Sequence, residues 1–295
     1  MNGDPSEMMP KEIEAAHGKA QPTFSKPGAH SDRKATMPAP LDYWDAVERF
    51  ELEILRTPGD LVLKDGDIAV TKSGDLMLNS PDYSAFFRLL QGWRYNAPVL
   101  EALFDLVAES GQAREAMEVH RGAALFPHSI DPVAAGSSMP DPVNTFRQLT
   151  EAIAAMGSAR SVYAGTVVMV LHALLLAFKD DIGATQAVWK AAPPLINGCS
   201  VGSILEASAN NFRHRDEWMK SRPPTERQLA SIRVLAAAFG EPLAPDGSRH
   251  SFVRDVCPET LELLGGGDFQ LLSLKIFEFA KNMAKVRGTG GVAAS

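Results

Sequence analysis

Apolar residues recur at every third or fourth position over most of the chain, which is the spacing of helices that bury one face. The first such stretch follows Asp42, a residue type that caps helix N-termini, and ends before Pro58. A second begins at Pro81 and is expected to break into two helices at a turn between Gly92 and Pro98. Together these patterns predict a mainly helical protein.

The helical pattern also covers the second half of the chain. Thr225 and Gln228 have the spacing of a capping box, and an apolar stripe follows them as far as Phe239. A last amphipathic stretch covers residues 269–286. Residues 143–287 are therefore expected to be helical almost throughout.

Residues 60–78 interrupt the helical pattern near the start of the chain. Three short apolar triplets are separated by Asp-Gly at residues 65–66 and Ser-Gly at residues 73–74, and both dipeptides are turn signals. This spacing predicts a three-stranded meander. Residues 41–126 would then form a small N-terminal α+β module.

Proline and glycine are unevenly distributed, and their clusters mark the expected domain limits. Residues 1–40 contain six Pro, three Gly and ten balanced charges, which predicts a disordered arm. Residues 127–142 contain four Pro and are expected to link the N-terminal module to the helical region at residues 143–287. Residues 288–295 would form a flexible tail.

The most apolar stretch of the chain is residues 161–178, which carry no formal charge at neutral pH. Its length is at the lower limit for a bilayer span. It also contains Gly165, Thr166 and His172 and lies among amphipathic neighbours, which favours a fully buried central helix. A membrane-associated protein is the alternative. Residues 1–40 lack the apolar core of a signal peptide, so a cytoplasmic protein without a membrane partner is expected.

Composition and charge exclude several classes of protein. Cys199 and Cys257 are too few for a disulfide scaffold or a cysteine-rich zinc site, and neither a metal nor a cofactor is expected. The formal net charge of −7 disfavours a protein that coats nucleic acid.

The charged residues are distributed unevenly along the chain. Residues 41–118 contain 15 acidic and 7 basic side chains, which suits a basic protein partner. Residues 213–233 contain six basic and three acidic ones, which suits a phosphate-bearing partner.

The segment from Ala209 to Trp218 has the pattern most typical of a functional site. On a helix, Asn210, His214, Glu217, Trp218 and Ser221 share one face, because steps of three and four residues return to the same side. The face brings together an amide, an imidazole and a carboxylate, which can orient a hydroxyl and move a proton. Basic side chains beside it can bind phosphate. An ion-paired helix surface anchored by Trp218 is the other interpretation.

Asn210, Arg213 and His214 resemble the Asn-x-x-Lys/Arg-His signature in part of the HEPN (higher eukaryotes and prokaryotes nucleotide-binding) superfamily. The resemblance covers about residues 141–287. It implies an up-and-down bundle of four or five helices, often a homodimer with its active site at the shared interface. Catalytic members are metal-independent ribonucleases, in which an Arg followed four to six residues later by His promotes attack of the 2′-hydroxyl on the adjacent phosphate. Such domains are common in bacterial defence and toxin systems.

The shared helical face, the basic side chains around it and the resemblance together give roles to individual residues. The candidate catalytic residues are Arg213, His214 and Glu217, and the candidate binding residues are Asn210, Arg215 and Lys220. The chain departs from the catalytic pattern at Ala209, where members with this Asn carry Arg. Two functions therefore stay open. One is an RNA-binding or ribonuclease-type protein of a bacterial defence or toxin–antitoxin system. The other is a non-catalytic interaction or regulatory protein that contacts its partner through the acidic N-terminal module.

Overall fold

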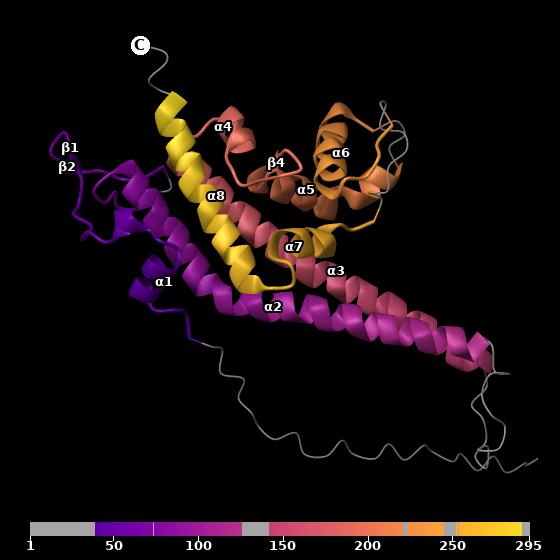
Figure 1. The fold of residues 1–295 in the computed structure, drawn as a ribbon. Helices are drawn as coiled ribbons and strands as arrows, with labels where there is room; N and C mark the ends of the chain where they lie inside the picture. The colour runs from indigo at the N-terminus through magenta and orange to yellow at the C-terminus, as the bar shows by residue number, and fades with distance from the viewer. Residues whose placement is uncertain are drawn as a thin grey trace, which may run out of the picture. The chain divides into compact units, whose positions relative to one another are not determined.

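The computed structural model describes residues 39–72, 74–125, 142–220, 224–244, 252 and 254–290. Most of these residues are helical, so the mainly helical class predicted from the sequence is confirmed (Figure 1). The α-helices in these ranges are α1 (Tyr43–Arg49), α2 (Pro81–Leu125), α3 (Pro142–Asp181), α4 (Gln186–Ala191), α5 (Val201–Lys220), α6 (Glu226–Phe239), α7 (Cys257–Gly265) and α8 (Phe269–Gly290). A short 3-10 helix, η1, covers Glu53–Leu55.

Several helix boundaries follow capping residues that are visible in the sequence. Asp42 caps α1, its side chain accepting a hydrogen bond from the backbone N–H of Trp44 at 2.8 Å. Thr225 and Gln228 form the predicted capping box at the start of α6. This helix ends at Gly240, whose φ of 67° lies in the left-handed region that glycine adopts without strain.

The β-structure is smaller than the sequence predicts. β1 (Leu63–Lys64) and β2 (Asp67–Ile68) form an antiparallel two-stranded sheet around the predicted Asp-Gly turn. The third apolar triplet contributes isolated bridges, such as the one between Val70 and Leu76. The three-stranded meander is therefore not shown in the described residues.

A second two-stranded sheet lies between α4 and α5 and was not predicted. β3 (Leu195–Ile196) pairs antiparallel with β4 (Cys199–Ser200). Asn197 and Gly198 connect them with φ values of 50° and 79°, as an Asn-Gly hairpin turn requires. Strands of two residues show no alternation of apolar and polar positions, so only the turn dipeptide could have indicated this hairpin.

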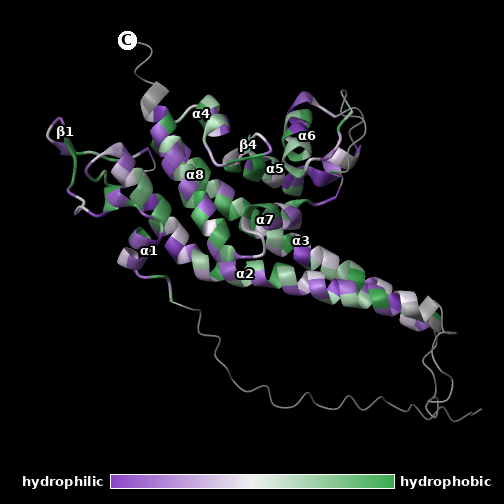
Figure 2. Ribbon diagram, viewed as in Figure 1, coloured by the Kyte–Doolittle hydropathy of each residue, from purple (hydrophilic) through white to green (hydrophobic). Residues whose placement is uncertain are grey.

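The two longest helices, α2 and α3, pack against each other along much of their length (Figure 1). Apolar and polar residues alternate along both, as expected of helices with one buried face (Figure 2). The expected turn between Gly92 and Pro98 is wrong, because α2 continues through Pro98 as one helix of 45 residues. Trp93 and Leu100 are buried on either side of the proline. The free energy gained by burying these side chains offsets the cost of the hydrogen bond that the proline removes.

The apolar middle of α3 is buried on one face only. Among the described residues, α3 is the helix long and apolar enough to cross a membrane by length and composition. In the structure, Val167 and Leu171 are fully buried, whereas Val162 is 54% exposed and Leu176 is 39% exposed. α3 is therefore buried on one side only, and the expectation of a fully buried helix is wrong.

Residues on both sides of the expected linker share one hydrophobic cluster. Phe50, which follows α1, stacks on Phe277 of α8 with ring centroids 3.9 Å apart, and Trp93 of α2 packs edge-on against both rings. The described residues from 39 onward also group as one compact unit. The sequence predicts two parts divided at residues 127–142, whereas in the structure residues from both parts pack around one core.

Most of the expected arm, linker and tail lies outside the described residues, which exclude residues 1–38, 126–141 and 291–295. α8 extends into the expected tail, to Gly290.

Candidate functional site

The segment singled out from the sequence lies in the second half of α5, a helix that contacts α3, α6 and α7. The helix begins after Ser200, whose hydroxyl oxygen accepts a hydrogen bond from the backbone N–H of Ser203 at 3.1 Å. Gly202 lies against aromatic rings of α4 and α8, and its missing side chain permits this close approach. The first half of α5 is thereby anchored in the core, and the second half carries polar side chains.

A pocket of about 380 Å³ lies between the second half of α5 and the start of α6. We call it the His214 pocket. It is lined by Asn210, His214, Glu217, Trp218, Lys220, Thr225, Arg227, Gln228 and Ser231. Four residues of the face predicted from the helical spacing therefore line one pocket, and the fifth, Ser221, lies outside the described residues.

His214 is held beside a carboxylate at the edge of this pocket. Its Nδ1 lies 3.3 Å from Glu217 Oε1, and both side chains are partly exposed to solvent. The backbone of His214, with φ −121° and ψ 15°, departs from helical values and divides α5 into two segments. Because the Glu217 carboxylate is next to Nδ1, Nε2 is the ring nitrogen that can exchange a proton with a ligand.

Amide and basic groups complete the His214 pocket. Asn210 Nδ2 donates to Ser231 Oγ at 3.3 Å, which fixes the amide against α6. Lys220 and Arg227 supply two positive charges against the one carboxylate of Glu217. The positive N-terminal end of α6 also lies at the pocket, and a helix N-terminus favours anions. The arrangement suits a phosphate group near an imidazole.

The structure does not bring all the sequence-predicted site residues together. Asn210, His214, Glu217 and Lys220 line the His214 pocket, but Arg213 and Arg215 do not. Arg213 Nε donates to Met169 Sδ of α3 at 3.1 Å. Arg215 lines a different cavity together with Phe212. Successive residues on a helix point about 100° apart, so these neighbours of His214 lie on other faces.

Sequence reasoning missed the contribution of α6. Thr225, Arg227, Gln228 and Ser231 line the pocket from this second helix. The capping-box pair and the basic stretch that includes Arg227 were both noted in the sequence. Nothing in the spacing says that α6 folds back against Asn210, because that contact depends on tertiary packing.

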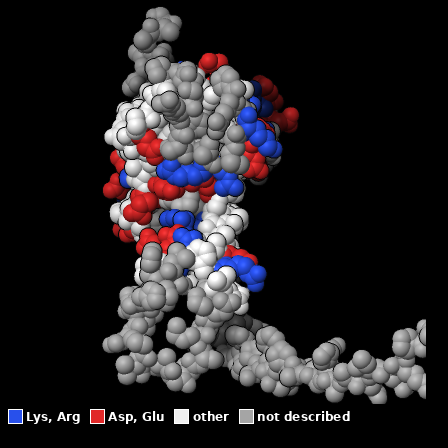
Figure 3. Space-filling view, turned by 90° about the vertical axis from the view of Figure 1, so that its right-hand side faces the viewer, with Lys and Arg blue, Asp and Glu red and all other residues white. Residues whose placement is uncertain are grey.

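Figure 3 shows Lys and Arg interspersed with Asp and Glu on the face it presents. Among the described residues, no three His, Cys, Asp or Glu side chains are grouped so that they could hold a metal ion. Cys257 is buried, and burial raises the pKa of its thiol well above the usual value, which disfavours a thiolate nucleophile. No family model, curated protein or solved structure matches the chain.

Proposed function

We propose that the protein binds RNA in the His214 pocket and acts on its phosphodiester backbone as a metal-independent, HEPN-like ribonuclease. The observation that carries the proposal is that one pocket contains an amide, an imidazole paired with a carboxylate, and two cations. The resemblance of Asn210, Arg213 and His214 to the family signature supports the same reaction, and with it a role in a bacterial defence or toxin–antitoxin system.

The chemistry requires a proton acceptor beside the 2′-hydroxyl and positive charge around the phosphate. In the proposed step, the 2′ oxygen forms a bond to phosphorus as the bond to the 5′ oxygen breaks. His214 Nε2 takes the proton of the 2′-hydroxyl, and the 5′ oxygen receives a proton from solvent. Lys220 and Arg227 neutralise the charge that develops on the phosphate. The products are a 2′,3′-cyclic phosphate and a 5′-hydroxyl.

The departure from the family pattern at Ala209 has a structural explanation within this proposal. Ala209 is fully buried in the hydrophobic core. A longer, charged side chain at this position would bury its charge, which is costly without a partner. In this chain, Lys220 and Arg227 take the place of that cation, and Arg227 comes from a different helix.

RNA binding tests the role of the two cations. We expect the double variant Lys220→Ala/Arg227→Ala to bind single-stranded RNA more weakly than the wild type. The slope of log K against log salt is negative, and each lost phosphate contact reduces its magnitude by about 0.7, so the magnitude should fall by about 1.4. Fluorescence anisotropy over a salt series measures both quantities.

The control is Lys64→Ala/Lys190→Ala, which removes two exposed lysines away from the pocket. This variant should keep the wild-type affinity and slope. Equal slopes for the wild type and the pocket variant would contradict phosphate binding at Lys220 and Arg227.

A second function, a non-catalytic interaction protein, is favoured by the surface of the β1–β2 hairpin. Apolar side chains are exposed there, with Leu63 at 65% and Ile68 at 48%. Exposed carboxylates such as Asp65 and Asp67 lie in the same hairpin. Such a surface suits a partner with basic and apolar side chains.

If this surface binds a protein, that protein should stay bound to the wild type after nuclease treatment in a pull-down. The variant Leu63→Ser/Ile68→Ser should lose the partner. The control Val119→Ser, which changes an exposed apolar residue of α2, should retain it.

The proposed ribonuclease would act as a homodimer, because the resemblance places active sites at shared interfaces. Sedimentation equilibrium determines the mass in solution directly. A mass near twice 31.8 kDa is expected. A mass of one chain at every concentration would contradict this part of the proposal.

A further inference from the structure

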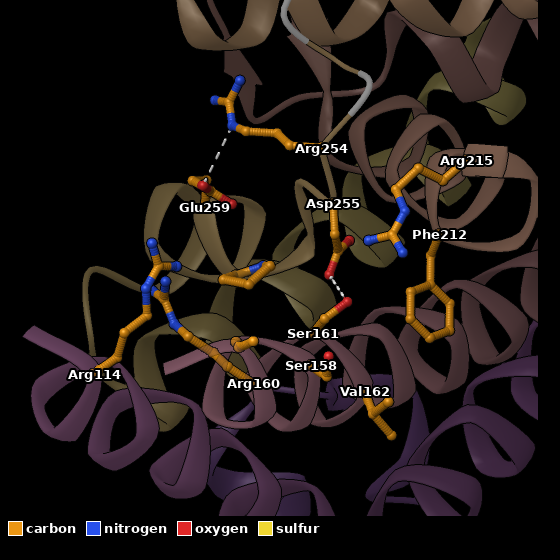
Figure 4. A pocket seen from close by; sticks show the side chains of 13 residues that line it. Arg114, Ser158, Arg160, Ser161, Val162, Phe212, Arg215, Arg254, Asp255 and Glu259 are labelled. Atoms are coloured by element: carbon orange, nitrogen blue, oxygen red, sulfur yellow. Dashed lines mark hydrogen bonds and ion pairs between the residues drawn. The ribbon is translucent and has the colours of Figure 1, made fainter. Parts of the chain in front are cut away.

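A second cavity, of about 490 Å³, lies beside α5 and is separate in its lining from the His214 pocket. We call it the arginine cavity. Four arginines line it, each from a different segment, and Figure 4 shows them around the opening. They are Arg114 of α2, Arg160 of α3, Arg215 of α5 and Arg254, which precedes α7.

Two of the four arginines are paired with carboxylates. Arg254 Nη2 lies 3.1 Å from Glu241 Oε1, and Arg254 Nε lies 3.6 Å from Glu259 Oε1. Arg114 Nε lies 3.0 Å from Glu118 on the same helix. Arg160 and Arg215 form no ion pair with a residue in the part of the chain that the structure describes. The lining therefore carries four arginines against two carboxylates, Asp255 and Glu259.

Arg160 carries a buried hydrogen-bond donor in this cavity. Its Nε is buried and has no hydrogen-bond partner among the described residues. A buried donor without a partner costs about 1–3 kcal/mol, so a group that accepts a hydrogen bond from Arg160 Nε would stabilise this cavity. Gly111 makes the position possible, because a side-chain carbon there would lie only 3.3 Å from Arg160 Nε. The guanidinium thus lies close against the backbone of α2.

The guanidinium groups of Arg114 and Arg160 are drawn close together in Figure 4, and Arg160 Nε lies against Gly111, one turn of α2 from Arg114. Like charges side by side repel unless an anion lies between them, and a phosphate accepts hydrogen bonds from two guanidinium groups in a planar fork. Ser158 also lines the cavity and lies near Ser161 in Figure 4. These groups are the donors that a phosphate dianion requires.

The cavity also contains an acceptor without a partner. Glu259 Oε2 is buried and unbonded among the described residues, although Glu259 Oε1 pairs with Arg254. Asp255 accepts a hydrogen bond from Ser161, and Arg215 points toward it in Figure 4. A ligand that satisfies both kinds of group carries a phosphate and, separately, a hydroxyl or amino donor.

We propose that the arginine cavity binds a small phosphomonoester that carries hydroxyl or amino groups. The phosphate lies between Arg114 and Arg160, and a donor of the ligand reaches Glu259 Oε2. The volume suits a metabolite-sized molecule. The site shares no lining residue with the His214 pocket, so the proposal stands independently of the ribonuclease function.

Isothermal titration of the full chain with inorganic phosphate and with glycerol 3-phosphate tests the proposal, with glycerol and sodium chloride as blanks at matched ionic strength. Both phosphates should bind, and the ester should bind more tightly because its hydroxyls reach Glu259. Arg160→Gln should weaken binding of both at least tenfold. Arg147→Gln, a change to an exposed arginine on the same helix, should leave binding unchanged.

The outcomes separate clearly. No binding of either phosphate, or equal binding by wild type and Arg160→Gln, overturns the proposal. Binding of inorganic phosphate without a preference for the ester overturns the assignment of Glu259. If Arg160→Gln fails to fold, Arg114→Gln decides the same comparison, because Arg114 is partly exposed and its loss leaves the core unchanged. Arg121→Gln is the matched control for that helix.

Discussion

Two histidines in neighbouring helices are placed in opposite environments, and this difference decides what each can do. His172 of α3 is 7% exposed and packs edge-on against Trp189, with ring centroids 6.4 Å apart. Burial lowers its pKa, the Glu206 carboxylate opposes that shift, and the Arg213 guanidinium adds to it. His214 instead lies partly exposed beside Glu217. Only His214 is placed to exchange a proton with a ligand.

The lowered pKa of His172 predicts a pH dependence of stability. In the unfolded chain the imidazole has its ordinary pKa near 6.5, so below that pH the unfolded state binds the proton more readily than the folded state. The contribution of His172 is therefore present above pH 6.5 and is lost as the pH falls toward the lower folded pKa.

The variant His172→Gln isolates this contribution. Its free energy of unfolding should fall less than that of the wild type between about pH 7 and pH 5, and urea titrations at several pH values measure the difference. Carboxylates elsewhere titrate equally in both proteins. The same loss of stability in both would contradict a lowered pKa at His172.

At the residue scale, helical spacing was sufficient to find part of the candidate site. Asn210, His214 and Glu217 line one pocket because positions three and four apart share a face. The spacing could not show that Arg213 turns to Met169 of α3, or that Arg227 of α6 joins the pocket. Both depend on which helices become neighbours.

At the scale of elements, close packing between helices overrides local preferences. Pro98 lies inside α2, although proline normally ends a helix, because residues on both sides of it are buried. Gly202 lies in the first turn of α5 against two buried rings. The sequence indicates which residues break helices in isolation, but packing against α3, α4 and α8 decides whether they do.

Gly202 provides a test of this packing. A side-chain carbon at this position would lie 2.7 Å from Trp189 Cζ2 and 2.7 Å from Phe279 Cζ, and both rings are buried. Gly202→Ala should therefore lower the free energy of unfolding by about 1–3 kcal/mol through overpacking. Urea denaturation monitored by circular dichroism measures the change.

Gly122→Ala is the control, since no atom lies within 4 Å of a side-chain carbon placed there in α2. It should leave stability unchanged or raise it by up to about 1 kcal/mol, because alanine favours a helix. Similar losses in the two variants would show that Gly202 has no special packing role.

At the scale of the whole molecule, segments far apart in sequence form one core. Phe50 from the N-terminal part and Phe277 from α8 stack on each other, and Trp93 contacts both. A Pro-rich segment looks the same in sequence whether it joins two domains or two helices that pack together. The helical segments could thus be predicted from the sequence, but the packing of the N-terminal part and α8 into one core could not.

The shared core predicts a single unfolding transition. Thermal unfolding followed by tryptophan fluorescence and by ellipticity at 222 nm should give coincident curves. Phe277→Ala should lower the free energy of unfolding by about 3–5 kcal/mol and shift both curves together. Leu274→Ala, a partly exposed site on the same helix, should shift them little. Two separate transitions would indicate two independent domains.

Cleavage of single-stranded RNA in the presence of EDTA tests the central claim most directly. The wild type should release fragments with 2′,3′-cyclic phosphate ends, and His214→Ala should cleave on the order of 100-fold or more slowly, because the proton acceptor is lost. His120→Ala, which changes an exposed histidine of α2, should cleave at the wild-type rate. An inactive wild type, or equal rates for wild type and His214→Ala, would contradict a ribonuclease site at His214.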